Sequence, residues 1–118
     1  MANKKQENKK QYCYVVQNAW KDRHGEEGFG IPRVRNSVKK ARKAMSEDVV
    51  AYLKMREGAV GEDGVIDGNV VDELNGEQLT GQTIDSVIKD VLENDSYEVN
   101  VDSEGTYSTW EIYRVEME

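Results

Sequence analysis

Apolar residues are scarce in this chain, and the spacing between them changes from one segment to the next. Leu, Ile, Val and Phe together number 25 of 118 residues, and 15 of these are Val. That proportion lies just above the level of about 20% below which highly charged chains tend to stay disordered. We therefore expect one small core and a single domain over residues 12–118. Residues 1–11 hold four lysines and no strong core-former, so we expect a flexible basic tail there.

Two segments have the apolar spacing of strands. Residues 12–20 are rich in aromatic and β-branched types at both parities, which is typical of a strand covered on both faces. Residues 97–117 alternate apolar and polar types, turn and return, which predicts a C-terminal β-hairpin. The apolar residues of the returning strand fall in both parities, so we expect either a bulge or burial on both faces. They are Trp110 and Ile112 in one parity, and Tyr113, Val115 and Met117 in the other.

Two other segments have helical spacing. Thr83 is suited to an N-cap, and apolar residues follow it at i, i+3, i+4, i+7 and i+8, which predicts a helix over 83–92. Asn36 and Ser37 are also N-cap types, and a short basic amphipathic helix is predicted over 36–45. Periodicity does not separate helix from strand between 49 and 55. We expect a strand there, because Val and Tyr lose rotamer freedom in helices, and a continuous helix over 37–57 is the alternative.

Glycine-rich segments lie between these elements. Residues 21–32 hold three glycines and the only proline, so we expect an exposed loop. Asp-Gly and Asn-Gly pairs between 58 and 81 predict tight turns, with brief strands at 65–66 and 70–71. Together the elements predict an α+β domain with a mixed or antiparallel sheet, two helices and a C-terminal β-hairpin.

Residues suited to catalysis or metal binding are few. Cys13 and His24 are the only cysteine and histidine, and we expect Cys13 to be a small inward strand residue and His24 a solvated loop residue. No phosphate-binding loop or nucleophile elbow is present. The acidic stretch 62–77 fails the EF-hand spacing, because counting from Asp63 puts Val65 at position 3 and Leu74 at position 12. We therefore expect no enzyme, no cofactor and no metal. With no run of about 18 apolar residues, we also expect a cytoplasmic protein.

Ionised residues are distributed very unevenly along the chain. Residues 1–45 carry a net charge of +8 and residues 46–118 a net charge of −15. Carboxylates on one helix face or on alternate strand positions lie about 5 to 7 Å apart, near the phosphate spacing along one DNA strand. We therefore expect a non-catalytic binding protein that docks on a basic partner, such as a nucleic-acid-handling enzyme, as a small inhibitor or regulator and a nucleic-acid mimic. The candidate partner-binding residues are Asp72, Glu73, Asp85, Asp90, Glu93 and Glu98.

In size, acidity and lack of catalytic motifs, the chain resembles the small accessory proteins of phages and mobile elements, some of which inhibit host nucleases. The likeness lies in composition and implies no particular residue role.

The basic segment supports a different hypothesis, in which the protein binds nucleic acid itself. Clustered basic side chains on a helix can contact phosphates with salt-sensitive affinity and little sequence preference. The overall charge of −7 opposes this by repelling a polyanion at long range. The candidate residues are Arg33, Arg35, Lys39, Lys40, Arg42 and Lys43.

Overall fold

The computed structural model describes residues 11–56, 59–72, 76–101 and 106–117. One antiparallel sheet and two helices form a single small domain, so the predicted α+β class is confirmed. The helices are α2 (Val38–Met55) and α3 (Ile84–Val91). The strands are β1 (Gln11–Lys21), β2 (Glu27–Phe29), β3 (Arg33–Arg35), β4 (Val70–Asp72), β5 (Glu77–Gln78), β6 (Ser96–Val101) and β7 (Thr106–Met117).

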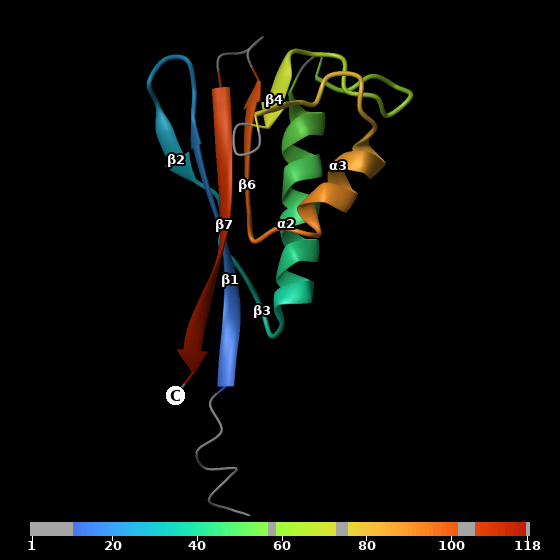
Figure 1. The fold of residues 1–118 in the computed structure, drawn as a ribbon. Coiled ribbons are helices and arrows are strands. Elements are labelled where there is room, and N and C mark those ends of the chain that lie inside the picture. Colours follow the sequence, from blue (N-terminus) through green and yellow to red (C-terminus); the bar gives the residue numbers. More distant parts are fainter. Residues whose placement is uncertain (1–10, 57–58, 73–75, 102–105, 118) are drawn as a thin grey trace, which may run out of the picture.

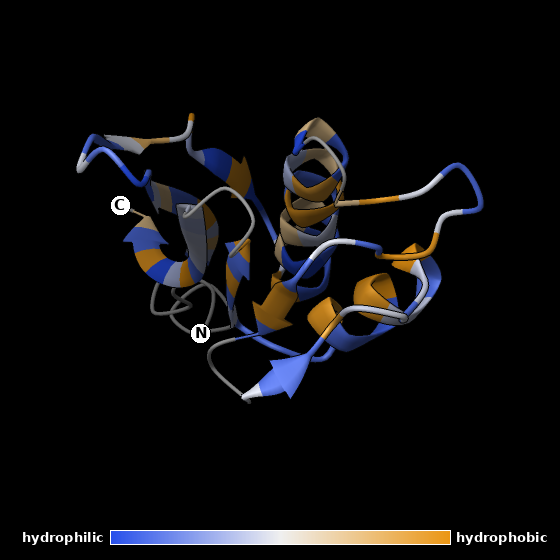
Figure 2. Ribbon diagram, turned by 90° about the horizontal axis from the view of Figure 1, so that it is seen from above, coloured by the Kyte–Doolittle hydropathy of each residue, from blue (hydrophilic) through white to orange (hydrophobic). Residues whose placement is uncertain are grey.

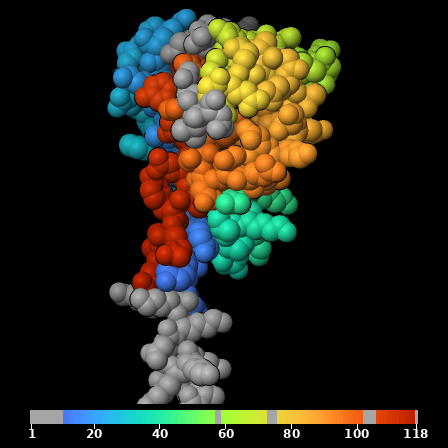
Figure 3. Space-filling model, in the orientation of Figure 1, coloured from blue at the N-terminus to red at the C-terminus, as the bar shows by residue number. Residues whose placement is uncertain are grey.

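A long two-stranded ribbon of β1 and β7 is the centre of the sheet (Figure 1). The strand order is β2-β1-β7-β6-β4-β5, and β3 also pairs with β1. The ladder of β1 and β7 runs without interruption from the pair Gln11 and Met117 to the pair Lys21 and Tyr107. Only the first half of β7 also pairs with β6, and β3 pairs with β1 no further down than Tyr14, so the lower end of the ribbon extends past the rest of the sheet (Figures 1 and 3).

The predicted C-terminal hairpin is confirmed as β6 and β7, and its turn lies outside the described residues. The expectation of a bulge or of burial on both faces of β7 is wrong. The register is continuous, and Trp110 and Ile112 pack on the core side. Tyr113, Val115 and Met117 lie on the opposite face and are about half exposed.

The second half of α2 corrects the strand that we predicted over 49–55. One helix runs from Val38 to Met55, with the Ser37 hydroxyl accepting a hydrogen bond from the Lys40 N–H as its N-cap. Val49, Tyr52 and Leu53 continue the buried stripe that begins at Ala41. Burying three large side chains against the sheet outweighs the few tenths of a kcal/mol that Val and Tyr cost in a helix.

Both helices pack on one face of the sheet and enclose the core between them and the strands (Figure 2). The predicted helix over 83–92 is confirmed as α3, whose N-cap Thr83 accepts a hydrogen bond from the Ser86 N–H. Along β6 the side chains alternate between half-buried and fully buried, so that Tyr97, Val99 and Val101 point into the core.

The glycine-rich segment over 21–32 is largely exposed, as predicted, but it contains the short strand β2. The Asp22 carboxylate accepts hydrogen bonds from the N–H groups of His24 and Glu26, and Gly25 takes a φ of +83° in the same turn. The chain then forms β2, in which Gly28 pairs with Trp20. A Cβ added at Gly28 would overlap the Trp20 ring, so this glycine allows the indole to lie across the strand.

Of the two brief strands predicted, 70–71 is confirmed within β4. Val65 and Ile66 form isolated bridges with Thr83 and Val60 instead of a strand.

Candidate functional site

Three carboxylates from three separate elements meet beside α3. They are Asp72 at the end of β4, Glu77 at the start of β5 and Asp90 in the last turn of α3, and one oxygen of each lies within 4.8 Å of the others. Asp72 has the same parity as the buried Val70, so it points into the core side of the sheet and is fully buried. Antiparallel pairing of β4 with β5 brings Glu77 opposite Asp72. The fold thus concentrates negative charge at one position.

Electrostatic repulsion within this cluster is visible in the properties of its members. Burial and then the negative charges of Asp72, Glu77 and Glu93 raise the pKa of Asp90. Burial and then the charges of Asp72, Asp90 and Glu77 raise the pKa of Tyr97 well above its ordinary value. Because like charges at short range disfavour ionisation, the cluster is a place where an added positive charge would be stabilising.

The six predicted partner-binding carboxylates lie in different environments. Asp85 and Glu93 are exposed and Asp90 is half-buried on the side of α3, whereas Asp72 lies beneath them. Glu98 has the opposite parity from Tyr97 on β6, so it lies on the other face of the sheet. Glu73 lies outside the described residues. Glu77 was not among the six, and only the pairing of β4 with β5 reveals its part in the cluster. We use the name acidic face for Glu77, Asp85, Asp90 and Glu93, with the buried Asp72 beneath them.

The basic candidates are partly neutralised by the protein itself. Arg33 forms ion pairs of 2.9 Å with both Glu47 and Asp48 and donates to the Ala44 carbonyl, which connects β3 to α2. These two carboxylates raise the pKa of Arg33.

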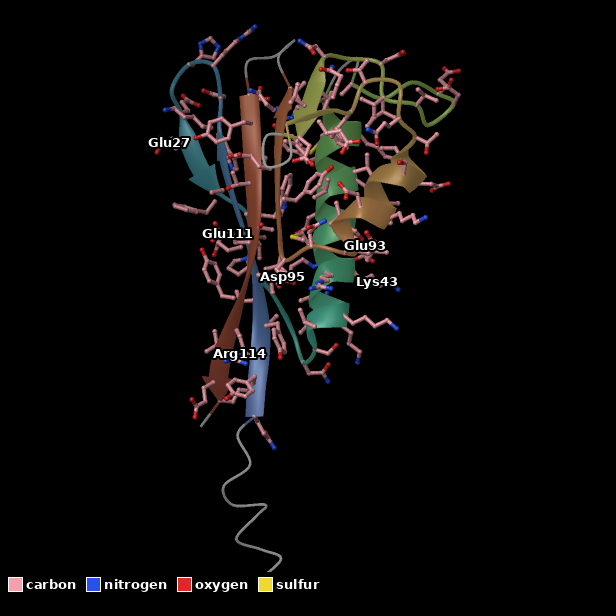
Figure 4. The ribbon with its side chains drawn as sticks, in the orientation of Figure 1. Glu27, Lys43, Glu93, Asp95, Glu111 and Arg114 are labelled. Carbon is pink, nitrogen blue, oxygen red and sulfur yellow. The ribbon has the colours of Figure 1, made fainter. Side chains whose placement is uncertain are left out.

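Of the remaining basic candidates, two interact with other groups of the protein and three are exposed. Arg42 contacts Asp95 at 2.7 Å, and Arg35 is half-buried and donates to the Val34 carbonyl. Lys39, Lys40 and Lys43 are exposed, and Lys43 and Glu93 both appear beside α2 in Figure 4.

An open cleft of about 760 Å³ lies between the β1–β2 hairpin and the C-terminal half of α2. Tyr52 and Trp110 lie at its base, where their rings pack edge to face with centroids 5.5 Å apart. No sequence pattern indicated this cleft, because its walls come from residues that lie far apart along the chain. The lining side chains include Trp20, Ile31, Arg33, Asp48, Met55, Arg56 and Tyr107.

Cys13 and His24 do not form a catalytic pair in this structure. Cys13 is half-buried near the start of β1, and His24 is exposed in the turn after its end. The eight-residue step from Cys13 to Lys21 alone spans about 26 Å in a strand. Cys13 pairs with Val115 and has the opposite parity from the buried Val16, so it lies on the face of the ribbon away from the core, and the expectation that it turns inward is wrong.

Comparison of the chain with protein-family models, with curated proteins and with solved structures returns no match. Neither helix in the described part of the chain is long and apolar enough to cross a membrane.

Proposed function

We propose that this chain is a non-catalytic binding protein whose acidic face docks on a basic macromolecular partner. The observation that carries the proposal is the convergence of Asp72, Glu77 and Asp90 beside α3, where burial, and then repulsion from Asp72, Glu77 and Glu93, raises the pKa of Asp90. A cationic partner surface would supply the charge that relieves this repulsion.

The finer form of the proposal is an inhibitor or regulator that occupies the basic groove of a nucleic-acid-handling enzyme. It is supported by Asp90 in the last turn of α3 and Glu93 just after it, because side chains three residues apart on a helix lie about 5 to 6 Å apart. Phosphates repeat at a similar distance along one strand of DNA. The likeness to small accessory proteins of phages and mobile elements supports the same form of the proposal.

Charge reversal at Asp85 in α3 and at Glu93 just after it tests the proposal. The purified protein and the variant Asp85→Lys/Glu93→Lys would each be used to capture proteins from a nuclease-treated lysate of the native host, followed by salt titration of the captured partner. We expect the variant to weaken binding at least tenfold, and the wild-type affinity to fall as salt rises.

A matched control is Glu26→Lys/Glu111→Lys, which changes the net charge equally but away from α3. Figure 4 shows Glu111 on the side of the sheet away from Glu93. Equal loss of binding in both double variants would show a response to net charge alone and would refute docking through α3.

A second candidate function is direct binding of nucleic acid, favoured by the exposure of Lys39, Lys40 and Lys43 in the first two turns of α2. Gel retardation at low salt would detect such binding, and replacing the three lysines with Ala should abolish it. If neither DNA nor RNA is retarded, this candidate is eliminated.

A further inference from the structure

The lower end of β7 lies at an open edge of the sheet. β7 pairs with β6 only as far as Glu111, and beyond it the Ile112 N–H donates to the carbonyl of Asp95, just before β6 begins. Among the described residues, no strand other than β1 pairs with β7 from 113 to 117. Such an edge is a template for another strand, which proline or a bulge would block. This segment contains neither.

The direction of the peptide groups along this edge follows from one hydrogen bond. Residues of a strand present their N–H and C=O groups alternately to its two sides, and the Ile112 N–H points away from β1 toward Asp95. Arg114 and Glu116 therefore direct their backbone groups to the open side, whereas the odd-numbered residues direct theirs to β1. A strand added here would form its hydrogen-bonded pairs at the even-numbered positions.

The side chains on both faces of this edge favour a second copy of the same segment. Two-fold symmetric pairing centred on Val115 places Arg114 opposite Glu116 of the second copy. Opposite charges directly across an antiparallel pair are stabilising, whereas centring the pairing on Arg114 would place two arginines opposite each other. On the other face the same register places Tyr113 opposite Met117, and both are about half exposed in the single chain. The segment is thus self-complementary in charge and in apolar contact.

Arg114 is already held on the ribbon in the single chain. Its guanidinium carbon lies 4.4 Å from the centroid of the Tyr12 ring on β1. Figure 4 shows Arg114 on the lower part of the ribbon, beyond the end of β6. A side chain that is ordered before association loses less conformational entropy when it meets a partner.

We propose that two copies of this chain form a two-fold symmetric dimer by antiparallel pairing of β7 over residues 113–117. The two ribbons then join in the order β1-β7-β7-β1. Arg114 and Glu116 of opposite copies exchange backbone hydrogen bonds, and Val115 faces its own counterpart across the two-fold axis. None of these residues belongs to the acidic face, so the dimer does not depend on the docking proposal.

Sedimentation equilibrium of the full chain at about 10 μM to 1 mM tests the dimer. A contact limited to 113–117 is small beside the roughly 20 to 30 residues a side of a standard interface, so we expect a dissociation constant on the order of 10⁻⁵ to 10⁻³ M. Arg114→Glu and Glu116→Arg should each raise this constant at least fivefold, because each places like charges opposite one another.

An equimolar mixture of these two variants should dimerise at least as well as the wild type. Each copy of one variant then meets opposite charges at both positions of the other, and a variant that had lost its fold would not be rescued in this way. Arg23→Glu is the matched control for Arg114→Glu, because it makes the same charge change at an exposed residue outside β7, and it should alter the constant less than twofold.

Three results would overturn the inference. The first is a wild-type chain that stays monomeric at about 1 mM, which would leave the open edge to an extended segment of another protein. The second is a mixture of Arg114→Glu and Glu116→Arg that dimerises no better than either variant alone. The third is an Arg23→Glu variant that weakens the dimer as much as Arg114→Glu does.

Discussion

At the scale of single residues, the exposed face of the ribbon contains a pair of side chains with a specific acid–base property. The Tyr113 hydroxyl donates a hydrogen bond to the Glu111 carboxylate two positions earlier on β7. This bond, together with the negative charge of Glu111, raises the pKa of Tyr113 above its ordinary value of 10.0. The phenol therefore keeps its proton to a higher pH in the folded protein than in the unfolded chain.

Replacing Glu111 with Gln should lower the pKa of Tyr113 toward 10.0, because both the charge and the strong acceptor are removed. The sign for stability follows from the raised pKa. The favourable contribution is present below the ordinary pKa of the phenol and is lost as the pH rises through the raised value. An NMR titration of the tyrosine ring signals between pH 8 and 12 would measure the change. An unaltered Tyr113 curve in the variant would contradict the assignment.

A second residue-scale prediction concerns Gly28. Gly28→Ala places a methyl group against the Trp20 ring, so the ring must move or the strand must shift, at a cost of about 1 kcal/mol or more. Urea unfolding measures this loss. In a Trp20→Leu background the same alanine should cost less, because the overlapping ring is gone. An equal cost in both backgrounds would mean that the indole does not determine the need for glycine.

At the scale of elements, α2 depends on its cap because its first turn contains no acidic residue. Ser37→Ala removes the hydroxyl that accepts from the Lys40 N–H, and we expect a loss of about 1 kcal/mol in the free energy of unfolding. The neighbouring Asn36→Ala is the control, since both residues are N-cap types but the structure assigns the role to Ser37. Greater destabilisation by Asn36→Ala than by Ser37→Ala would contradict this N-cap.

The sequence predicted the elements that have a clear pattern of apolar residues within their own segment. Apolar spacing indicated β1, α3 and the β6–β7 hairpin, and a good N-cap residue preceded α3. It did not predict β2 and β3, because three-residue strands form only where the edge of β1 offers hydrogen-bond partners. The sequence also indicated a strand for 49–55, where the structure has a helix. Packing against the sheet there outweighs the local preference of Val and Tyr for strands.

The candidate site was predictable in composition but not in arrangement. The sequence indicated Asp72 and Asp90 as members of an acidic region, because carboxylates are dense in that half of the chain. It did not join them with Glu77 and Tyr97, since their proximity depends on the order of strands in the sheet. The cleft above Trp110 was missed for the same reason.

At the scale of the whole molecule, the longest ladder joins the two ends of the described chain. Every pair between β1 and β7 closes a loop of about 90 residues or more, and loop entropy must be lost before such pairs form. We therefore expect refolding from denaturant in milliseconds to seconds, as for other domains dominated by distant pairing. Stopped-flow fluorescence of Trp20 and Trp110 would measure the rate. Complete refolding within microseconds would show that the β1–β7 ladder does not limit folding.

The register of that ladder also determines how the chain could be reconnected. Gln11 and Met117 are direct partners, so their Cα atoms lie about 5 Å apart at the free end of the ribbon. A two-residue turn is enough to join antiparallel partners at this separation. A circular permutant closed there and opened in the turn after β1 would turn the most distant pairing in the protein into a local hairpin, with every strand keeping its neighbours.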